Sequence, residues 1–251
     1  MPCIDAFEPL AYGQIERELY IRLVRHANGG TLGREALANL EADLEESKGK
    51  KTEEVMLRLL DSVFRVLGFE VQRGNGPRET CKRKTAGSTL KFGPEGDDLA
   101  AVFARTPLAY SEARAGWVLA VEAKAGRAPK KSVGQAVTFA GRVRSAWGEE
   151  WCVHPVVVSG HETYSEKSAK DYARDNAVVH LPVSGLVATA KHQWEQFRAG
   201  KGLVTPPGLL SFVAYARDAG YTEPTAEELA KAVSEIAERR SAAWLPDKFG
   251  S

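Results

Sequence analysis

The stretch GWVLAVEAK, residues 116–124, decides the fold class of this chain. Its uncharged beginning predicts a strand, and Glu122 and Lys124 stand together at the end. Residues two apart in a strand face the same way, so these charged side chains project from one face, and Val121 and Ala123 from the other. A charged pair that closes so apolar a run suggests a functional role, although an exposed cross-strand ion pair is the blander interpretation of a lone Glu-x-Lys.

Helices and strands on both sides of this stretch indicate an α/β fold with a mixed sheet. Thr52 is the expected N-cap of an amphipathic helix that Gly68 ends. Strands are predicted at 69–71, 98–103, 116–124, 155–159 and 178–182, with helices around 137–143, 209–217 and 225–240. We therefore expect a mixed β-sheet flanked by helices over residues 49–215, a helical N-terminal segment over 1–48 and a helical C-terminal tail over 216–251.

The composition is that of an ordinary globular protein. Of its 251 residues, 43% are hydrophobic and 27% charged, which argues against disordered, collagen-like and disulfide-scaffold classes. No apolar run approaches the ~20 residues that a membrane span needs, so no membrane partner is expected. Cys3, Cys81 and Cys152 lie far apart and are odd in number, which favours a cytoplasmic location over a disulfide framework or a clustered zinc site. Cys152 is expected to be a buried strand cysteine.

Two aspartates, Asp97 and Asp98, precede the strand predicted at 98–103. If that strand neighbours 116–124, one of these carboxylates lies beside Glu122. Two carboxylates at one point form a hard oxygen site that suits Mg²⁺, for which Mn²⁺ is an expected substitute. A metal there would polarise a phosphoryl oxygen, and Lys124 beside it would orient or deprotonate an attacking water. Together these groups predict hydrolysis of a phosphodiester.

Asp98 and Glu122-Ala123-Lys124 resemble the signature of the PD-(D/E)xK nuclease superfamily, with Gly96-Asp97 where the family's proline-aspartate often lies. Between residues 60 and 213 the order of motifs is similar to that of the FokI-type cleavage domain of type IIS restriction endonucleases. The shared points include Gly68-Phe69, Gly134-Gln135-Ala136 and Ser159-Gly160-His161. This resemblance implies a restriction-endonuclease-like core.

The chain departs from that pattern around the first carboxylate. The proline before it is missing, so Asp98, at the start of the apolar strand, is favoured as the metal ligand, with Asp97 as the alternative. Glu122 replaces an aspartate, and the loop at 105–116 is longer. The resemblance then implies that Asp98 and Glu122 hold Mg²⁺ and that Lys124 acts on the water.

Residues outside this centre have weaker expected roles. Gln135 would support the active site or contact the DNA backbone, with an ordinary polar residue near a helix start as the equal alternative. Asp61 lies where the family's helix carries a glutamate, and Glu54 lies two turns earlier. Either would support the metal ligands or hold a second metal, although a solvated helix face is the more common role. Cys152 and His154 suggest a metal pair, but no second Cys/His pair accompanies them.

Basic residues flank the predicted carboxylates in sequence, although the formal net charge is only +1. Residues 73–91 hold six basic side chains and one acidic one, and residues 124–144 hold six basic side chains and none acidic. Such segments neutralise phosphates with little sequence preference, although a solvated charged loop would explain either one alone. The expected DNA-binding residues are Arg73, Lys82, Arg83, Lys84, Lys130, Lys131 and His161. For His161 an ordinary surface-loop histidine is the more common role.

These observations predict a metal-dependent endonuclease that acts on double-stranded DNA, as a cleavage module or subunit of a type IIS-like restriction or defence system. One such site cuts one strand, and the resemblance implies a homodimer or a partner subunit for double-strand cleavage; a partner is also expected to supply sequence recognition. The alternatives are a structure-specific nuclease such as a junction resolvase, a catalytically inactive DNA-binding protein with a nuclease fold, and a small-molecule enzyme.

Overall fold

A mixed five-stranded sheet forms the centre of the protein. The computed structural model describes residues 53–67, 69–74, 98–104, 116–149, 151–198 and 205–244. Within them the strands run in the order β1-β2-β3-β4-β5. The first three pair antiparallel, and β3, β4 and β5 pair parallel. Their bounds are Glu70–Arg73 (β1), Leu99–Ala104 (β2), Gly116–Lys124 (β3), Trp151–Ser159 (β4) and Val179–Pro182 (β5). The predicted α/β class with a mixed sheet is thereby confirmed.

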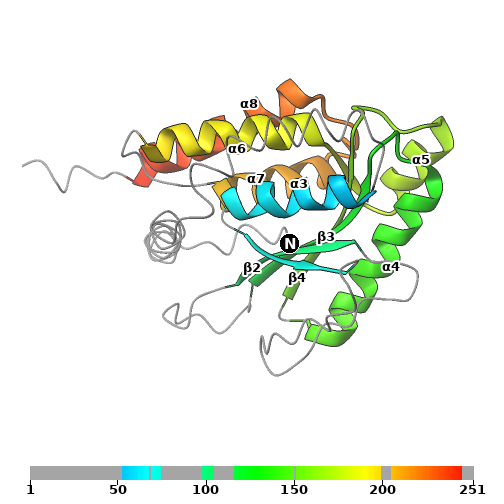
Figure 1. Ribbon diagram of the computed structural model, residues 1–251. Coiled ribbons are helices and arrows are strands. Elements are labelled where there is room, and N and C mark those ends of the chain that lie inside the picture. Colours follow the sequence, from blue (N-terminus) through cyan, green and yellow to red (C-terminus); the bar gives the residue numbers. More distant parts are fainter. Residues whose placement is uncertain are drawn as a thin grey trace, which may run out of the picture.

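Helices cover both faces of this sheet (Figure 1). The described helices are α3 (Glu53–Val66), α4 (Lys130–Trp147), α5 (Lys167–Asp175), α6 (Val183–Arg198), α7 (Thr205–Asp218) and α8 (Ala226–Trp244). α3, α4, α7 and α8 confirm predicted helices, whereas α5 and α6 were not predicted from the sequence. α7 continues through residue 215, where the sequence suggested a domain boundary. The predicted helices of residues 1–48 and the N-cap Thr52 lie outside the described residues.

The larger core lies on the face of the sheet covered by α3, α6, α7 and α8. Trp117, Leu119 and Val121 of β3 point into it and are fully buried. Leu60 of α3 and Leu210 of α7 belong to the same cluster. A strand with helices on both sides reads as a nearly continuous apolar run, and this is why β3 carries no charge before Glu122.

A second core lies on the opposite face, beneath α4. Val118 and Ala120 of β3 pack there against Phe139 and Val143 of α4. Farther along this face, Val157 of β4 packs with the first turns of α4 and with α5. The alternation along β3 therefore assigns each of its residues to one of the two layers, and this assignment places the charged pair at its end on the α4 side.

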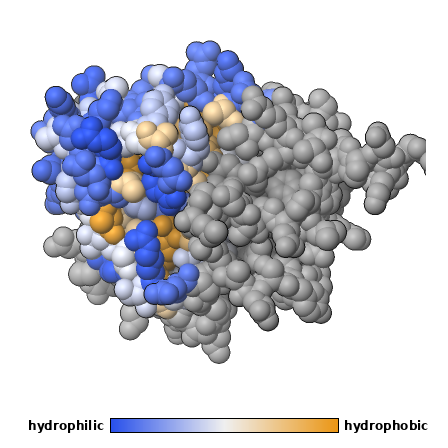
Figure 2. Space-filling view, turned by 180° about the vertical axis from the view of Figure 1, so that it is seen from behind, coloured by the Kyte–Doolittle hydropathy of each residue, from blue (hydrophilic) through white to orange (hydrophobic). Residues whose placement is uncertain are grey.

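One side of the described surface is largely hydrophilic (Figure 2). Figure 2 shows polar side chains over most of the described surface on one side, with small hydrophobic areas between them. The exposed large hydrophobic side chains among the described residues are Tyr215 and Tyr221. No helix in the described part of the chain is both long and apolar enough to span a bilayer.

The end of α5 carries a residue in a left-handed backbone conformation. The Ala177 N–H donates to the carbonyl of Arg174 and the Val178 N–H to that of Ala173, which is the Schellman arrangement. Ala177 has φ of 55°, although glycine is the residue that adopts this conformation without steric cost. The sequence thus places a strained alanine where the motif favours glycine.

Replacing this alanine should stabilise the fold. Ala177→Gly relieves a left-handed strain of about 1–2 kcal/mol and costs somewhat less in unfolded-chain entropy, for a net gain of about 0.5–1 kcal/mol. Chemical denaturation of wild type and variant measures this gain. Ala188→Gly, on the exposed face of α6, is the control and should instead lose about 1 kcal/mol. Equal losses in both variants would contradict the assigned strain.

Candidate functional site

The register between β2 and β3 brings the two predicted carboxylates together. Leu99 pairs with Val121, so Asp98, one step earlier on its chain, lies opposite Glu122. Leu99 and Val121 belong to the larger core, and the alternation of a strand therefore directs Asp98 and Glu122 to the α4 face. Both acids are almost completely buried, with 1% and 2% of their surface exposed.

Asp98 is held by the backbone of the strand beside it. Its Oδ2 accepts a hydrogen bond of 2.7 Å from the Ala123 N–H. The Gly74 N–H in turn donates to the main-chain carbonyl of Asp98 at 2.8 Å. The first bond joins the start of β2 to the end of β3, and the second joins it to the residue after β1, so the Asp98 carboxylate has a defined position beside Glu122.

Lys124 completes a charged group on the same face. Its Nζ lies 2.9 Å from Glu122 Oε1, and 26% of the lysine side chain is exposed. The lysine therefore reaches from the buried carboxylate towards solvent. Lys124 also pairs in register with Ser159 of β4, which pairs with Pro182 of β5. The ends of the three parallel strands lie at one edge of the sheet, where open α/β sheets usually bind ligands.

The donors at this edge fit a hard divalent cation. Two buried carboxylates side by side repel each other unless positive charge compensates them, and Lys124 supplies one such charge. Mg²⁺ is commonly held by one or two carboxylates and keeps several waters. No cluster of three or more His, Cys, Asp or Glu occurs among the described residues. Asp98 and Glu122 would therefore hold the cation with water or substrate oxygens as the remaining ligands.

Two polar residues that the sequence did not single out lie on the same face. Gln72 pairs with Ala100, two residues beyond Asp98, and is 3% exposed. Ser132 is fully buried in the first turn of α4. Gln72 Oε1 and Ser132 Oγ have no hydrogen-bond partner. The alternation of Val71 and Gln72 along β1 was the available signal for the glutamine; nothing comparable marked the serine.

The other predicted site residues that the structure describes lie away from Asp98 and Glu122 or make no described contact with them. Asp61 lies on α3, which covers the other face of the sheet, and pairs with Arg65 at 3.0 Å. Arg73 pairs with Leu99 and so belongs to the α3 side of β1. Gln135 is partly buried in the second turn of α4. Asp97, Lys82, Arg83, Lys84 and the side chain of Glu54 lie outside the described residues.

Two predicted DNA-binding lysines open helix α4. Lys130 and Lys131 are exposed, and the first turn of α4 holds no acidic residue. Lys130 Nζ lies 5.0 Å from the centre of the Tyr172 ring of α5. Positive side chains are unfavourable at the positive end of a helix dipole. Because this first turn has no acidic residue, its positive charge is not compensated within the turn.

A buried histidine organises the end of β4. His180 Nε2 lies 2.7 Å from Ser159 Oγ, which also lies 2.7 Å from the main-chain carbonyl of His161. The serine has one proton and gives it to the carbonyl, so His180 donates from Nε2 and its buried Nδ1 has no partner. Burial lowers the pKa of His180 to about 4. The imidazole of His161, a predicted DNA contact, is exposed.

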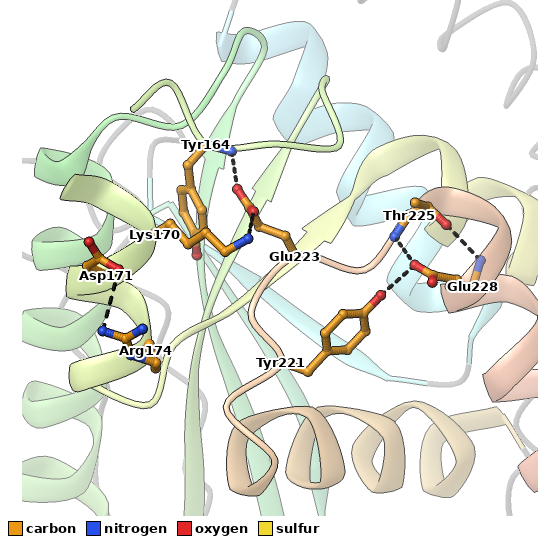
Figure 3. Close-up of polar contacts among 8 residues, drawn as sticks. All are labelled: Tyr164, Lys170, Asp171, Arg174, Tyr221, Glu223, Thr225 and Glu228. Carbon is orange, nitrogen blue, oxygen red and sulfur yellow. Dashed lines mark hydrogen bonds and ion pairs between the residues drawn. The ribbon is translucent and has the colours of Figure 1, made fainter. Parts of the chain in front are cut away.

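The connection between α7 and α8 reaches the loop that follows β4 (Figure 3). Glu223 Oε1 accepts from the Tyr164 N–H at 2.8 Å, and its Oε2 lies 2.6 Å from Lys170 Nζ. Beside it, Thr225 and Glu228 exchange hydrogen bonds with each other's backbone N–H and so form a capping box at the start of α8. Sequence reasoning assigned no role to Glu223.

Cys152 and His154 form no metal site with other described residues. Arg217 donates towards His154 Nδ1 at 3.4 Å, so Nε2 carries the proton and lies 3.3 Å from Cys152 Sγ. Burial, with Arg217 and Arg144 nearby, lowers the pKa of His154 to about 3. Cys152 is buried in β4, as predicted.

A pocket of about 490 Å³ opens at the start of β4, at the opposite end of the strand from Ser159. Its described lining is Arg144, Ser145, Glu149, Trp151, Cys152, Val153 and Arg217. Arg144 Nη2 already donates to the Val153 carbonyl, and Arg217 pairs with Asp218. The carboxylates therefore do not line this pocket.

Comparisons with known proteins add no further identification. No protein-family model matches the chain, and no curated protein matches it significantly.

Both buried histidines make the fold acid-sensitive. Because their pKa values fall to about 3 and about 4 on folding, the unfolded chain binds more protons below pH 6.5, and stability decreases as the pH falls from 6.5 towards 4. At pH 5 each histidine should cost about 2 kcal/mol relative to pH 7. Denaturant unfolding of His154→Asn at both values should show a loss about 2 kcal/mol smaller than in wild type. Replacement of the exposed His161 by Asn should keep the wild-type loss; a parallel pH dependence in all three proteins would contradict the assignment.

Proposed function

We propose that this chain is a metal-dependent DNA endonuclease of the PD-(D/E)xK type, with a restriction-endonuclease-like core. The observation that carries the proposal is the placement of Asp98 opposite Glu122, with Lys124 on the same face and ion-paired to the glutamate. Glu122 and Lys124 face the same way because they are two residues apart in a strand. The register between β2 and β3 adds Asp98 to the same face.

Bound Mg²⁺ would polarise the phosphoryl oxygen and lower the pKa of a coordinated water. Asp98 and Glu122 would hold the cation, and the Ala123 N–H would keep the Asp98 carboxylate in position. Lys124, partly exposed at the end of β3, would orient the attacking water or accept its proton, and its charge would offset that of the phosphate.

The charge on α4 supports a polyanionic substrate. Lys130 and Lys131 extend the positive end of a helix that begins six residues after Lys124. Helix N-termini and lysines both favour phosphate oxygens, and neither reads sequence. Their proximity in the chain to the carboxylates supports DNA as the substrate. One such centre hydrolyses one strand, so a second copy or a partner subunit would supply the second cut and the sequence recognition.

Cutting of supercoiled plasmid tests the chemistry. We expect wild type to nick plasmid with Mg²⁺ or Mn²⁺, and Asp98→Asn, Glu122→Gln and Lys124→Met each to lower the single-turnover rate by about 10²-fold or more. Asn can still accept the Ala123 N–H, so the D98N effect reports on charge rather than on lost structure. Asp175→Asn, which changes an exposed carboxylate on α5, is the control and should keep the wild-type rate. Wild-type nicking by all three site variants would overturn the proposal.

Salt dependence of DNA binding tests the role of α4. Duplex binding in EDTA should weaken as salt rises, and Lys130→Gln/Lys131→Gln should reduce the slope of log affinity against log salt by about 2. Lys231→Gln, on the exposed face of α8, should leave the slope unchanged. An equal slope in wild type and the double variant would remove these lysines from the DNA interface.

A further inference from the structure

The loop between β4 and α5, residues 160–166, lies against the end of β3. The Gly160 N–H donates to the main-chain carbonyl of Lys124, and the Ser165 N–H to that of Ala128, both at 3.0 Å. A Cβ at residue 160 would overlap the carbonyl oxygen of Ala125. Glycine is therefore required at this position by close approach to the backbone that follows Lys124.

Glu223 contacts the same loop at Tyr164 (Figure 3). It accepts the Tyr164 N–H at 2.8 Å and pairs with Lys170 of α5 at 2.6 Å. The loop also contacts the C-terminal helices through its own side chain. Glu162 Oε1 accepts a hydrogen bond of 2.9 Å from the Ala226 N–H at the start of α8. Glu223 is only 14% exposed, and a hydrogen bond to a charged acceptor is among the stronger ones in a protein.

The connection that carries Glu223 is itself fixed to the sheet. The His180 N–H of β5 donates to the carbonyl of the buried Thr222 at 3.1 Å. The capping box of Thr225 and Glu228 defines the start of α8 just beyond it. The backbone of Glu223 is therefore held on both sides by contacts that do not involve the loop. Its side chain can for this reason restrain the loop.

We infer that Glu223 is a positioning residue of the candidate site: it fixes the loop of residues 160–166, and through the Gly160–Lys124 hydrogen bond it fixes the backbone of the lysine. As a role in cleavage, this inference rests on the proposed function. The C-terminal helices α7 and α8 are then part of the apparatus that sets the geometry of the site, although they cover the other face of the sheet.

Amide hydrogen exchange on the metal-free, DNA-free protein tests the attachment. Glu223→Ala should speed exchange of the Tyr164 and Gly160 amides by about tenfold or more, with little change at core amides of β3. Glu223→Gln keeps an acceptor for the Tyr164 N–H and should exchange nearly as wild type. Glu162→Ala removes the exposed contact of the loop with the Ala226 N–H and should also speed exchange of these amides. It replaces Glu223→Ala as the test variant if that protein folds poorly. Wild-type exchange at both amides in Glu223→Ala and in Glu162→Ala would overturn the inference.

Single-turnover nicking with saturating plasmid tests the consequence for catalysis. Glu223→Ala should lower the rate about tenfold with DNA affinity in EDTA unchanged, and Glu223→Gln should recover most of it. Asp171→Asn, which breaks an ion pair with Arg174 elsewhere on α5, is the matched control and should retain both rate and exchange. A wild-type rate in Glu223→Ala despite faster exchange also overturns the inference. Absence of nicking in wild type counts against the proposed function alone, because the exchange comparison does not depend on it.

Discussion

The hydrogen bond from the Ala123 N–H to Asp98 Oδ2 is the interaction on which the candidate site depends. It joins the start of β2 to the end of β3 through a side chain, one step beyond the last backbone pair of the two strands. It fixes the Asp98 carboxylate beside Glu122. Burial of two acids at one point is costly unless positive charge and hydrogen bonds compensate them. This backbone donor and Lys124 provide such compensation, and a divalent cation would add more.

The fold supplies the rigidity that this arrangement needs. β3 is buried on both faces, so its register cannot slip without moving the Trp117, Leu119 and Val121 side chains out of the larger core. The same register fixes Glu122 and Lys124 on the opposite face. Parallel pairing with β4 and β5 then brings the ends of three strands, and the loop at 160–166, to one edge. The packing of one layer thereby determines the geometry of the chemical groups in the other.

Much of this arrangement could be predicted from local sequence. The alternation in β3 gave the facing of Glu122 and Lys124, and the apolar run after Asp98 gave β2. Helices α5 and α6 were missed because α5 is short and polar, with only Ala169 and Ala173 buried, and α6 follows β5 without a break. The role of Glu223 could not be predicted at all. Its partners Tyr164 and Lys170 lie more than fifty residues away along the chain, and such pairings are set by tertiary packing rather than by any local pattern.

Several buried polar atoms on the α4 and α5 side of the sheet have no hydrogen-bond partner. A buried polar atom without a hydrogen-bond partner occurs in each of Gln72, Ser132, Trp147, Trp151, Tyr164 and His180. By register or cluster, these lie on the α4 and α5 side. Each such atom costs about 1–3 kcal/mol, a cost that the apolar core beneath α3, α6, α7 and α8 must offset. A natural fold retains such costs where function requires polar groups to be held ready. Asp98, Glu122 and Lys124 lie on this same side of the sheet, so the polar groups of the candidate site belong to the layer opposite the larger apolar core.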